Sequence, residues 1–431
     1  MREMKDSGVK WIGEIPKEWC VLPNKHLMKK EKNICEKYNG EDILSLSMKG
    51  VIVRDLDAGG KMPTTFDGYQ YLRKGNLLMC LFDIDVTPRC IGLIKNDGLS
   101  SPAYSQFSLS KKANAEYYYY YYLMLDNSKT LYHLAKNLRH SLTEEQLGVI
   151  PTIAPPLADQ QKIAAHLDRK CTQIDALISN AQQQIEKLKA YKQSVITETV
   201  TKGLDPDVKM KDSGVEWIGE IPEHWKVTNI GRLCFVTKLA GFEYTSHMVN
   251  NLSDDGEVPV VRAQNIKMGI FIDIINDYIS MELSEKLHRC ALDKKCLLIT
   301  FIGAGIGEVA IFNKEARYHL APNVAKIVIN ENYKEILSEE FLLFYLMSYA
   351  GQEEVNKIKK ATAQPSLSME TIRSIKFVIP TKNEQQAISD YLDHKCSQID
   401  KLIALKQQKI EKLQQYKKSL IYEYVTGKKE V

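Results

Sequence analysis

Two long stretches of the chain carry apolar residues at a spacing of seven, and most of these are followed by another apolar residue four places later. Charged residues and glutamines fill the positions between them. The first stretch has this pattern at Leu167, Cys171, Ile174, Ile178, Ile185, Leu188 and Val195, and the second at Leu392, Cys396, Ile399, Ile403, Ile410, Leu413 and Leu420. This heptad pattern predicts two long helices, each with a narrow apolar seam.

Helices of this kind need a partner to cover the seam. At ~1.5 Å per residue, about forty residues form a rod on the order of 60 Å long, which is far longer than a typical helix of a globular protein. The obvious partner of each helix is the other one. Cys171 and Cys396 lie on the seams, where a small buried apolar residue is much commoner than a redox or metal site.

The chain also repeats itself outside these helices. The segment MKDSGVKWIGEIPKEW, which begins at Met4, returns 206 positions later as MKDSGVEWIGEIPEHW, which begins at Met210. The helical segments begin QQKIAAHLDRKC at Gln160 and QQAISDYLDHKC at Gln385, and these are 225 positions apart. The order is therefore motif, variable block and long helix, twice over, and it indicates an internal duplication whose second copy is 19 residues longer.

The variable blocks combine short apolar strands with helices. Residues 258–261 and 297–302 have the length of strands, EEFLLFYLMSY has the composition of a buried helix, and a proline-bearing strand that ends at Pro156 or Pro380 precedes each long helix. This mixture predicts tandem α/β or α+β domains. The predicted division is a first domain at 1–156, a long helix at 157–203, a second domain at 204–380 and a second long helix at 381–431.

Composition restricts the class of protein only weakly. The chain has 431 residues, 44% of them hydrophobic, and its 58 basic and 54 acidic residues leave a net charge of +4, so charge alone neither supports nor excludes DNA as a partner. Nine scattered cysteines without a Cys-x-x-Cys pair indicate reduced thiols and make a zinc site unlikely on spacing grounds. No stretch approaches the ~18 apolar residues of a membrane span, so we expect a cytoplasmic protein without a membrane partner.

Motifs of catalysis are missing from the sequence. The glycines of FIGAGIGE, at Gly303, Gly305 and Gly307, do not have the spacing of a dinucleotide site and indicate a tight turn between strands. No phosphate-binding loop is found, and SPAY at Ser101 lacks the amide and the second proline of the adenine methyltransferase tetrapeptide. The run EYYYYYYLML could stack on unpaired bases, but its counterpart in the second half shares only its hydrophobicity, which favours a core helix.

Taken together, these motifs resemble the specificity subunit of type I restriction-modification systems. The resemblance rests on SGVKWIGEIP and SGVEWIGEIP at the start of each domain, on the proline and Gln-Gln pair before each helix, and on VTKGL and VTGK after them. It covers almost the whole chain, whereas the variable blocks match only in outline. In LDKKCLLIT the second block lacks a glycine that LRKGNLLM has in the first.

The resemblance implies two target-recognition domains that read different halves of a bipartite target in double-stranded DNA. It implies that the long helices form an antiparallel pair within a pseudo-twofold repeat and dock two modification subunits, which carry S-adenosylmethionine and flip the target adenine out of the stack. Restriction subunits would use ATP and Mg, so this chain would carry no cofactor and no catalytic residue. Two alternatives stay open. The first is a coiled-coil scaffold or an anti-restriction protein, which would bind proteins rather than DNA. The second is a chain that was once part of a fused single-chain enzyme.

Candidate base-reading residues follow the strands of the variable blocks. Arginine can pair bidentately with guanine, and glutamine or asparagine with adenine, in the major groove. On this basis the candidates are Arg262, Gln264, Asn265 and Lys267 in VPVVRAQNIKMG, Gln364 and Ser366 in TAQPSLS, and Arg139, His140 and Ser141 in LRHSLT. Each of them could instead belong to a solvated turn or contact a phosphate, and one sequence does not reveal the target that is read.

Overall fold

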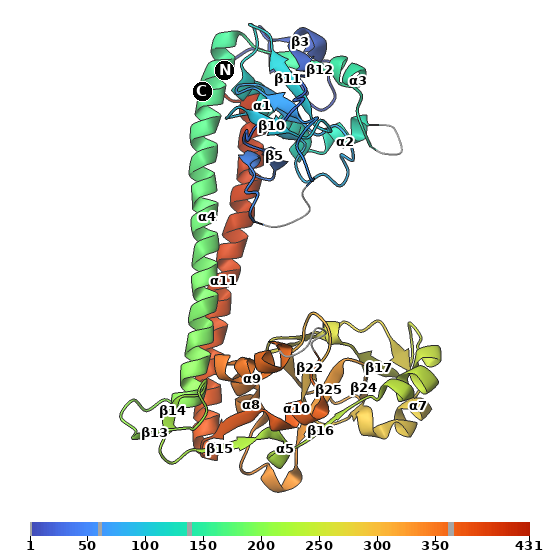
Figure 1. The fold of residues 1–431 in the computed structure, drawn as a ribbon, viewed down its shortest axis with the longest axis vertical. Coiled ribbons are helices and arrows are strands. Elements are labelled where there is room, and N and C mark those ends of the chain that lie inside the picture. Colours follow the sequence, from blue (N-terminus) through green and yellow to red (C-terminus); the bar gives the residue numbers. More distant parts are fainter. Residues whose placement is uncertain (1, 59–62, 136–139, 361–365) are drawn as a thin grey trace. The chain divides into compact units, whose positions relative to one another are not determined.

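The computed structural model of the protein describes residues 2–58, 63–135, 140–360 and 366–431 (Figure 1). The chain forms two compact units: unit 1 comprises Met1–Gln182 and Gln407–Val431, and unit 2 comprises Gln183–Lys406. The two predicted long helices are confirmed as α4 (Leu157–Lys202) and α11 (Lys382–Val425). Each unit contains a segment of both helices. The predicted division into two domains and two long helices stays a prediction.

Unit 1 is built around an antiparallel four-stranded sheet of order β4-β11-β8-β9. Four antiparallel strand pairs complete the β structure described for this unit: β1-β2, β3-β12, β5-β6 and β7-β10. The strands are β1 (Met4–Asp6), β2 (Glu14–Pro16), β3 (Cys20–Pro23), β4 (Met28–Glu31), β5 (Leu44–Ser47), β6 (Gly50–Val53), β7 (Gln70–Leu72), β8 (Leu77–Met79), β9 (Ile91–Leu93), β10 (Gly98–Ser100), β11 (Ser105–Leu109) and β12 (Pro151–Ala154). The helices are α1 (Ala115–Asn127), α2 (Thr130–Leu134) and α3 (Glu144–Gly148).

Unit 2 repeats this sheet as β16-β25-β22-β23 and adds a second four-stranded sheet, β20-β17-β24-β21, in which β17 and β24 are parallel. Its strands are β13 (Met210–Asp212), β14 (Glu220–Pro222), β15 (Lys226–Asn229), β16 (Cys234–Lys238), β17 (Val258–Val261), β18 (Ile266–Lys267), β19 (Ile270–Phe271), β20 (Tyr278–Ile279), β21 (Ala291–Leu292), β22 (Cys296–Thr300), β23 (Val309–Phe312), β24 (Tyr318–Leu320), β25 (Val324–Ile329) and β26 (Lys376–Ile379). Its helices are α5 (Ile230–Leu233), α6 (Gly241–Glu243), α7 (Met281–Lys286), α8 (Glu339–Met347), α9 (Tyr349–Lys360) and α10 (Met369–Ser374).

The long helices run antiparallel inside each unit. In unit 1 the Lys417 ammonium lies 2.6 Å from the Asp175 carboxylate, and in unit 2 that of Lys192 lies 2.7 Å from the carboxylate of Asp400. These two ion pairs are related by the 225-residue repeat. The seam cysteines Cys171 and Cys396 are buried in the apolar cores, as the heptad pattern predicts.

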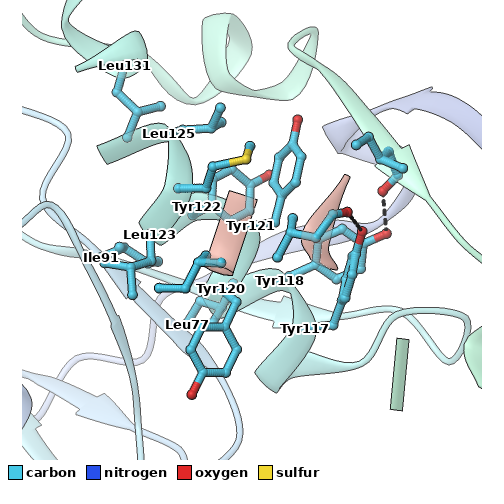
Figure 2. Close-up of a cluster of buried hydrophobic side chains, with 14 of the residues drawn as sticks. Leu77, Ile91, Tyr117, Tyr118, Tyr120, Tyr121, Tyr122, Leu123, Leu125 and Leu131 are labelled. Atoms are coloured by element: carbon cyan, nitrogen blue, oxygen red, sulfur yellow. Dashed lines mark hydrogen bonds between the residues drawn. The ribbon is translucent and has the colours of Figure 1, made fainter. Parts of the chain in front are cut away.

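The tyrosine run forms the core helix α1, as its counterpart α8 indicates. Figure 2 shows Tyr117, Tyr118, Tyr121 and Tyr122 packed among leucines of unit 1. The Tyr117 hydroxyl donates to the carbonyl of Val425 at 2.7 Å, and the other three hydroxyls also have partners inside the unit. The prediction of a core helix is confirmed, and these four rings are not available for stacking on bases.

Candidate functional site

The repeated opening motif holds the ends of the long helices. Trp19 in unit 1 is fully buried, and its indole nitrogen donates to the Asp159 carboxylate, in the first turn of α4, at 3.1 Å. Trp225 in unit 2 is equally buried and donates to Glu384, in the first turn of α11, also at 3.1 Å. The motif thus occurs in both units, and in each unit it anchors the start of one long helix in the same way.

The same tryptophans also pack against the end of the other long helix. Gly427 follows α11 with a φ of 72°, and a Cβ there would lie 2.8 Å from the Trp19 ring. Gly203 follows α4 with a φ of 81°, and a Cβ there would lie 3.2 Å from the Trp225 ring. Both positions favour glycine because the backbone is left-handed. At Gly427 a Cβ would also clash with Pro16, 2.5 Å away, and with the Trp19 ring, whereas at Gly203 its contact with the indole would only be tight. Each tryptophan thus joins the start of one helix to the end of the other within its own unit.

The first glutamine of each Gln-Gln pair completes this frame. In unit 1 the Gln160 amide accepts a bond from the N-cap residue of α1, Asn114, at 2.7 Å and donates to the carbonyls of Lys112 and Pro155. In unit 2 Gln385 makes the three equivalent bonds, to Ser338, Ile336 and Pro380. Both glutamines are buried. An alignment of the two copies shows that this glutamine is kept in both, but it does not show which groups the glutamine contacts.

Away from the frame, the two units carry different loops at one edge of the main sheet. In unit 2 the hairpin β18-β19 lies beside β23, because the Gly269 amide donates to the carbonyl of Val309 at 2.8 Å. Lys267 on this hairpin lies 3.2 Å from the carboxylate of Glu308. A β-ribbon of two strands is one of the elements that fit the major groove of DNA.

Two of the candidates, which directly precede this hairpin, hold the loop itself. Asn265 is buried, and its amide group donates to the carbonyls of Ile272 at 3.0 Å and Ile274 at 2.8 Å. The Arg262 guanidinium is paired with Asp277, and the hydrogen bond to this carboxylate raises the pKa of Arg262. A guanidinium has five N–H groups, so this pair leaves donors for a second acceptor.

The other two candidates of this segment, Gln264 and Lys267, are exposed. After Lys267 the chain also exposes apolar side chains, at Met268 and Ile270 in the hairpin and at Ile274 just beyond it. Amide, ammonium and apolar groups of this kind can contact adenine edges, phosphates and thymine methyl groups respectively. The sequence analysis did not single out the apolar members, although Ile270 follows the Met-Gly turn directly.

The glycine-rich turn lies at the same edge of the sheet as the candidate Ser366. The segment 303–308 connects β22 to β23, as a strand turn was predicted to do, and ends at Glu308, the partner of Lys267. Directly before this turn, Ile302 forms a β-bridge with Ser366. The structure therefore places Lys267 and Ser366 at opposite ends of one turn, whereas Gln364 lies outside the described residues.

Unit 1 has the corresponding arrangement with different residues. The amide of Leu142 donates to the carbonyl of Leu81 at 2.8 Å, as that of Leu367 does to Phe301 at 2.9 Å in unit 2. Ser141 and Ser366 precede these amides and occupy equivalent places. The carbonyl of His140 accepts a hydrogen bond from the Ile84 amide. The centre of the His140 ring lies 4.6 Å from the centre of the Tyr132 ring. Arg139 lies outside the described residues.

The described parts of the chain contain no group of three or more histidine, cysteine, aspartate or glutamate side chains that could hold a metal ion. All nine cysteines are free thiols, and burial raises the pKa of Cys171 to about 11, which keeps this thiol protonated at neutral pH. No described helix has the length and apolarity that would let it cross a membrane.

Comparisons with known proteins fit this architecture. Residues 222–415 match the family model of the type I restriction modification DNA specificity domain. The chain is 26% identical over 279 residues to the MjaVIII specificity subunit of Methanocaldococcus jannaschii, across 64% of this chain and 61% of the relative. It is 27% identical over 239 residues to the EcoBI specificity subunit of Escherichia coli, across 54% of this chain and 49% of the relative. The matches thus span less than two thirds of these relatives.

The fold has counterparts among solved structures. A chain from a structure that concerns complex assembly and conformational transition of the type I R-M system has a TM-score of 0.71 at 13% identity, covering 95% of this chain and 98% of that one. The HsdS subunit from Thermoanaerobacter tengcongensis has a TM-score of 0.50 at 13% identity and covers 96% of this chain and 98% of its own. At such identity the likeness concerns the fold alone.

Proposed function

The chain belongs to the family of specificity subunits of type I restriction-modification systems, and from this premise we propose that it reads a bipartite target in double-stranded DNA. Each unit would read one half of the target. The observation that carries the proposal is the contrast between a shared frame and different sheet edges: Trp19 and Gln160 recur as Trp225 and Gln385, whereas the edge loops differ in length and residue type.

In unit 2 the proposed reading surface is the hairpin β18-β19 with the adjoining turn. Gln264 is exposed and offers an amide for an adenine edge, and Arg262 offers guanidinium donors for guanine. Lys267 is a candidate for phosphate, and Asn265 acts by holding the loop. Ser366 would belong to the same surface. Gln364 lies outside the described residues and stays a candidate on its sequence alone. In unit 1 the surface would comprise Arg139, His140 and Ser141.

The proposed partners supply the chemistry. Two modification subunits would bring S-adenosylmethionine and methylate adenine, restriction subunits would bring ATP and Mg, and this chain would bind no cofactor and catalyse no step. Its role would be to select the sequence, in the cytoplasm, where DNA and partners meet. The absence of a phosphate-binding loop and of a methyltransferase tetrapeptide in the sequence agrees with this division of labour.

The test is competitive binding of the assembled methyltransferase to targets with single-base changes, at fixed salt. Gln264→Ala and Arg262→Ala should each cost ~1 to 3 kcal/mol on the cognate site and relax one position of one half-site. Lys267→Ala should weaken binding to every sequence and lower the salt slope by about 1. An unchanged profile for the first two variants would move the reading surface elsewhere in unit 2.

Independence of the two units has its own test. Exchange of Trp19 to Ile150 for the corresponding block of another specificity subunit should change one half of the methylated motif and leave the other half as it was. Methylation-aware sequencing of the host genome would record both halves. A change in both halves would contradict separate readers. Failure of the assembly to retain any specific duplex would favour the alternative, a scaffold or anti-restriction protein that binds proteins only.

A further inference from the structure

Unit 1 contains a cavity of about 730 Å³ between the core of its domain and the two long helices. One wall comes from α1 and from the residues that directly precede β6, β9 and α2, and the opposite wall comes from α4 and α11. All of its lining residues belong to unit 1. Sites of ~300 to 1,000 Å³ are typical for small-molecule ligands, so this cavity has the size of such a site.

The cavity carries an excess of positive charge. Its basic lining residues outnumber its two acidic ones, and they are Lys49, Arg89, Lys129, Lys417 and Lys418. The Asp126 carboxylate lies 3.8 Å from the Arg89 guanidinium. The Asp175 carboxylate lies 2.6 Å from the Lys417 ammonium. The other three lysines form no ion pair within the described part of the chain, so the cavity should attract a ligand with several negative charges.

The cavity also contains an aromatic ring. Tyr119 is only partly buried and lines the cavity, whereas the other five tyrosines of its run in α1 are buried. Burial raises the pKa of the Tyr119 hydroxyl, and the charge of the neighbouring Arg89 offsets this only in part, so the hydroxyl stays protonated at neutral pH. A tyrosine ring beside cations can stack on a planar base whose phosphates contact those cations.

A second cavity, of about 350 Å³, adjoins the first, since Tyr119 and Leu123 line both of them. Its charged lining residues balance one another, and they are Lys49, Lys95, Lys417, Glu116, Asp168 and Asp175. Carboxylates can accept hydrogen bonds from the hydroxyl and amino groups of a nucleoside. The space on which Tyr119 opens therefore has a basic part, suited to phosphates, and a charge-balanced part, suited to a nucleoside.

Lys129 lies at the cavity in a conformation that lysine seldom adopts. Its φ of 57° is in the left-handed region, which favours glycine and asparagine. Lys129 is the N-cap residue of α2, but its side chain makes no capping hydrogen bond. The turn between α1 and α2 thus does not need a lysine here. Residues in such sparsely populated conformations are concentrated at functional sites, where the side chain has a role.

Unit 2 differs at the equivalent place. The N-caps of α1 and α8 correspond, so Tyr119 matches Leu343, and the 225-residue repeat matches Lys418 with Gln193. Leu343 is buried, and the Gln193 amide donates to the carbonyl of Met347 at 2.9 Å. In unit 2 the helices α4 and α8 are thus joined directly where unit 1 has the ring and the ammonium. The shared frame does not need Tyr119 or Lys418, which indicates a role special to unit 1.

We propose that the cavity of unit 1 binds a nucleoside polyphosphate, with its base stacked on the Tyr119 ring and its phosphates beside Lys129 and Lys418. The guanidinium of Arg89 keeps donors for phosphate oxygens, which arginine binds in a bidentate way. Side chains would hold the phosphates, in place of the backbone amides of a phosphate-binding loop. The nucleotide would be an effector and not a cofactor, and one site in one unit predicts one nucleotide per chain.

The walls of the cavity predict what binding would do. They come from the domain core and from both long helices of unit 1, so a bound nucleotide would tie these parts of the unit together. A ligand that binds only the folded state stabilises that state by mass action. Unit 1 should therefore gain protection from hydrogen exchange with the nucleotide, and unit 2 should not. This inference goes beyond the reading of DNA and does not depend on it.

The experiment is a calorimetric titration of the full chain with ATP, without partner subunits or DNA. One ATP should bind per chain. ATP should bind more tightly than AMP, and AMP more tightly than adenosine, because the lysines contact phosphates. Inorganic tripolyphosphate, which lacks the base, should bind more weakly than ATP. Hydrogen exchange read by mass spectrometry on the same samples should place the added protection in unit 1.

Three variants test the named contacts. Lys129→Gln and Lys418→Gln should each weaken ATP binding by ~10-fold and leave adenosine binding unchanged, because a charge-assisted hydrogen bond to phosphate is lost. Tyr119→Leu should weaken ATP binding by at least ~5-fold and leave tripolyphosphate binding unchanged, because only stacking is lost. Tyr119→Leu and Lys418→Gln introduce the residues that unit 2 has at these places, so circular dichroism of both variants should match that of the wild type.

The matched control is Lys412→Gln, at an exposed lysine of α11 outside the cavity lining, which should bind ATP as the wild type does. No saturable binding at millimolar ATP, or full affinity in all three variants, would overturn the inference. Tripolyphosphate binding as tight as that of ATP, without an effect of Tyr119→Leu, would show a general anion site instead.

A last arm distinguishes a free nucleotide from DNA, which offers the same phosphates and bases. If non-specific duplex DNA displaced ATP and the three variants weakened DNA binding equally, the cavity would be a DNA contact and the inference would be wrong. Each of these contrary results would leave the proposed function intact, because the reading of DNA is tested separately, on single-base variants of the target with the assembled methyltransferase.

Discussion

The two units share a frame and differ in what they build on it. Both have an antiparallel four-stranded sheet of the same order, a buried tryptophan bound to a carboxylate, and a buried glutamine that caps a core helix. Unit 2 adds a second sheet with a core cluster of its own around Val260, Phe312 and Leu320. Unit 1 has only strand pairs there, with small clusters around Leu99 and Leu78.

This difference shows that the variable part of each unit is supported locally. In unit 2 the cluster around Phe312 and the cluster that surrounds Trp225 lie on opposite faces of the shared strand β22, where Leu298 belongs to the first and Leu297 to the second. We therefore expect substitutions at the exposed edge of the sheet to disturb the anchors of the long helices less than substitutions on the face that packs around Trp225. Such separation suits a protein in which the frame is kept and the surface that contacts a partner is free to change.

The largest expected effect comes from the anchoring tryptophans. Trp19→Ala should destabilise unit 1 by ~3 to 5 kcal/mol, because a fully buried indole and its bond to Asp159 are lost. Trp225→Ala should do the same to unit 2. Hydrogen exchange read by mass spectrometry on the full chain would show which unit loses protection. Equal loss in both units from either variant would contradict independent anchoring.

The sequence predicted the frame far better than the contacts that hold it. Heptads at Leu167 and Leu392 sufficed for the helices, since a long periodic seam has few alternatives. The bond between Trp19 and Asp159 joins residues 140 positions apart, and no local pattern reveals such a pair. The repeat showed which residues are kept, but the partner in unit 2 is a glutamate, which hides the correspondence.

The candidate site was predicted less well, for a physical reason. A polar residue after a strand can read a base, bind phosphate or hold its own loop, and the residue type is the same in each case. Gln264 and Asn265 are neighbours, yet one is exposed and the other is buried with both amide hydrogens bonded. Only the path of the loop decides between them, and that path depends on carbonyls seven and nine residues farther along.

The next largest effect is a difference in stability between substitutions of the first and the second glutamine of each Gln-Gln pair. Gln160→Ala should lower the free energy of unfolding of unit 1 by ~1 to 3 kcal/mol, because one buried amide makes three hydrogen bonds whose partners would be left unpaired. Gln161→Ala, one position along and exposed, is the matched control and should change it by less than ~0.5 kcal/mol. Urea unfolding would measure both, and Gln385→Ala against Gln386→Ala repeats the test in unit 2. Equal effects within a pair would refute the capping role.

The variable part of unit 2 offers a similar comparison of two neighbouring residues, Asn265 and Gln264. Asn265→Ala should destabilise unit 2 by ~1 to 3 kcal/mol, since the carbonyls of Ile272 and Ile274 lose their donor. Gln264→Ala should leave stability within ~0.5 kcal/mol of the wild type and alter DNA binding only. Thermal unfolding followed by circular dichroism would compare them. If Gln264→Ala were the more destabilising change, the assignment of holding and reading residues would be reversed.

The smallest expected effect is a pH dependence of stability, which comes from the carboxyl groups that anchor the buried tryptophans. Burial alone would raise the pKa of Glu384, but hydrogen bonds from Thr381 and Trp225, with His224 2.9 Å away, outweigh it and lower the pKa to about 2. The Asp159 pKa is also lowered, against the effect of burial, chiefly by the hydrogen bond from Arg2. A carboxyl whose pKa falls on folding stabilises the protein above its unfolded pKa of ~4.3 for glutamate, and this stabilisation is lost as the pH falls through the folded value.

Unit 2 should therefore lose part of its stability between about pH 4 and pH 2, and Glu384→Gln should remove that part. Glutamine keeps an oxygen that can accept the Trp225 bond but carries no charge, so the variant isolates the titration from the hydrogen bond. The side chain of Glu384 is 35% exposed, and solvent screening keeps the effect well below that of Trp225→Ala. The measurement is the difference between wild-type and variant urea midpoints of unit 2 across this pH range. A difference that stays constant with pH would show that the anchor depends on the hydrogen bond and not on the charge of Glu384.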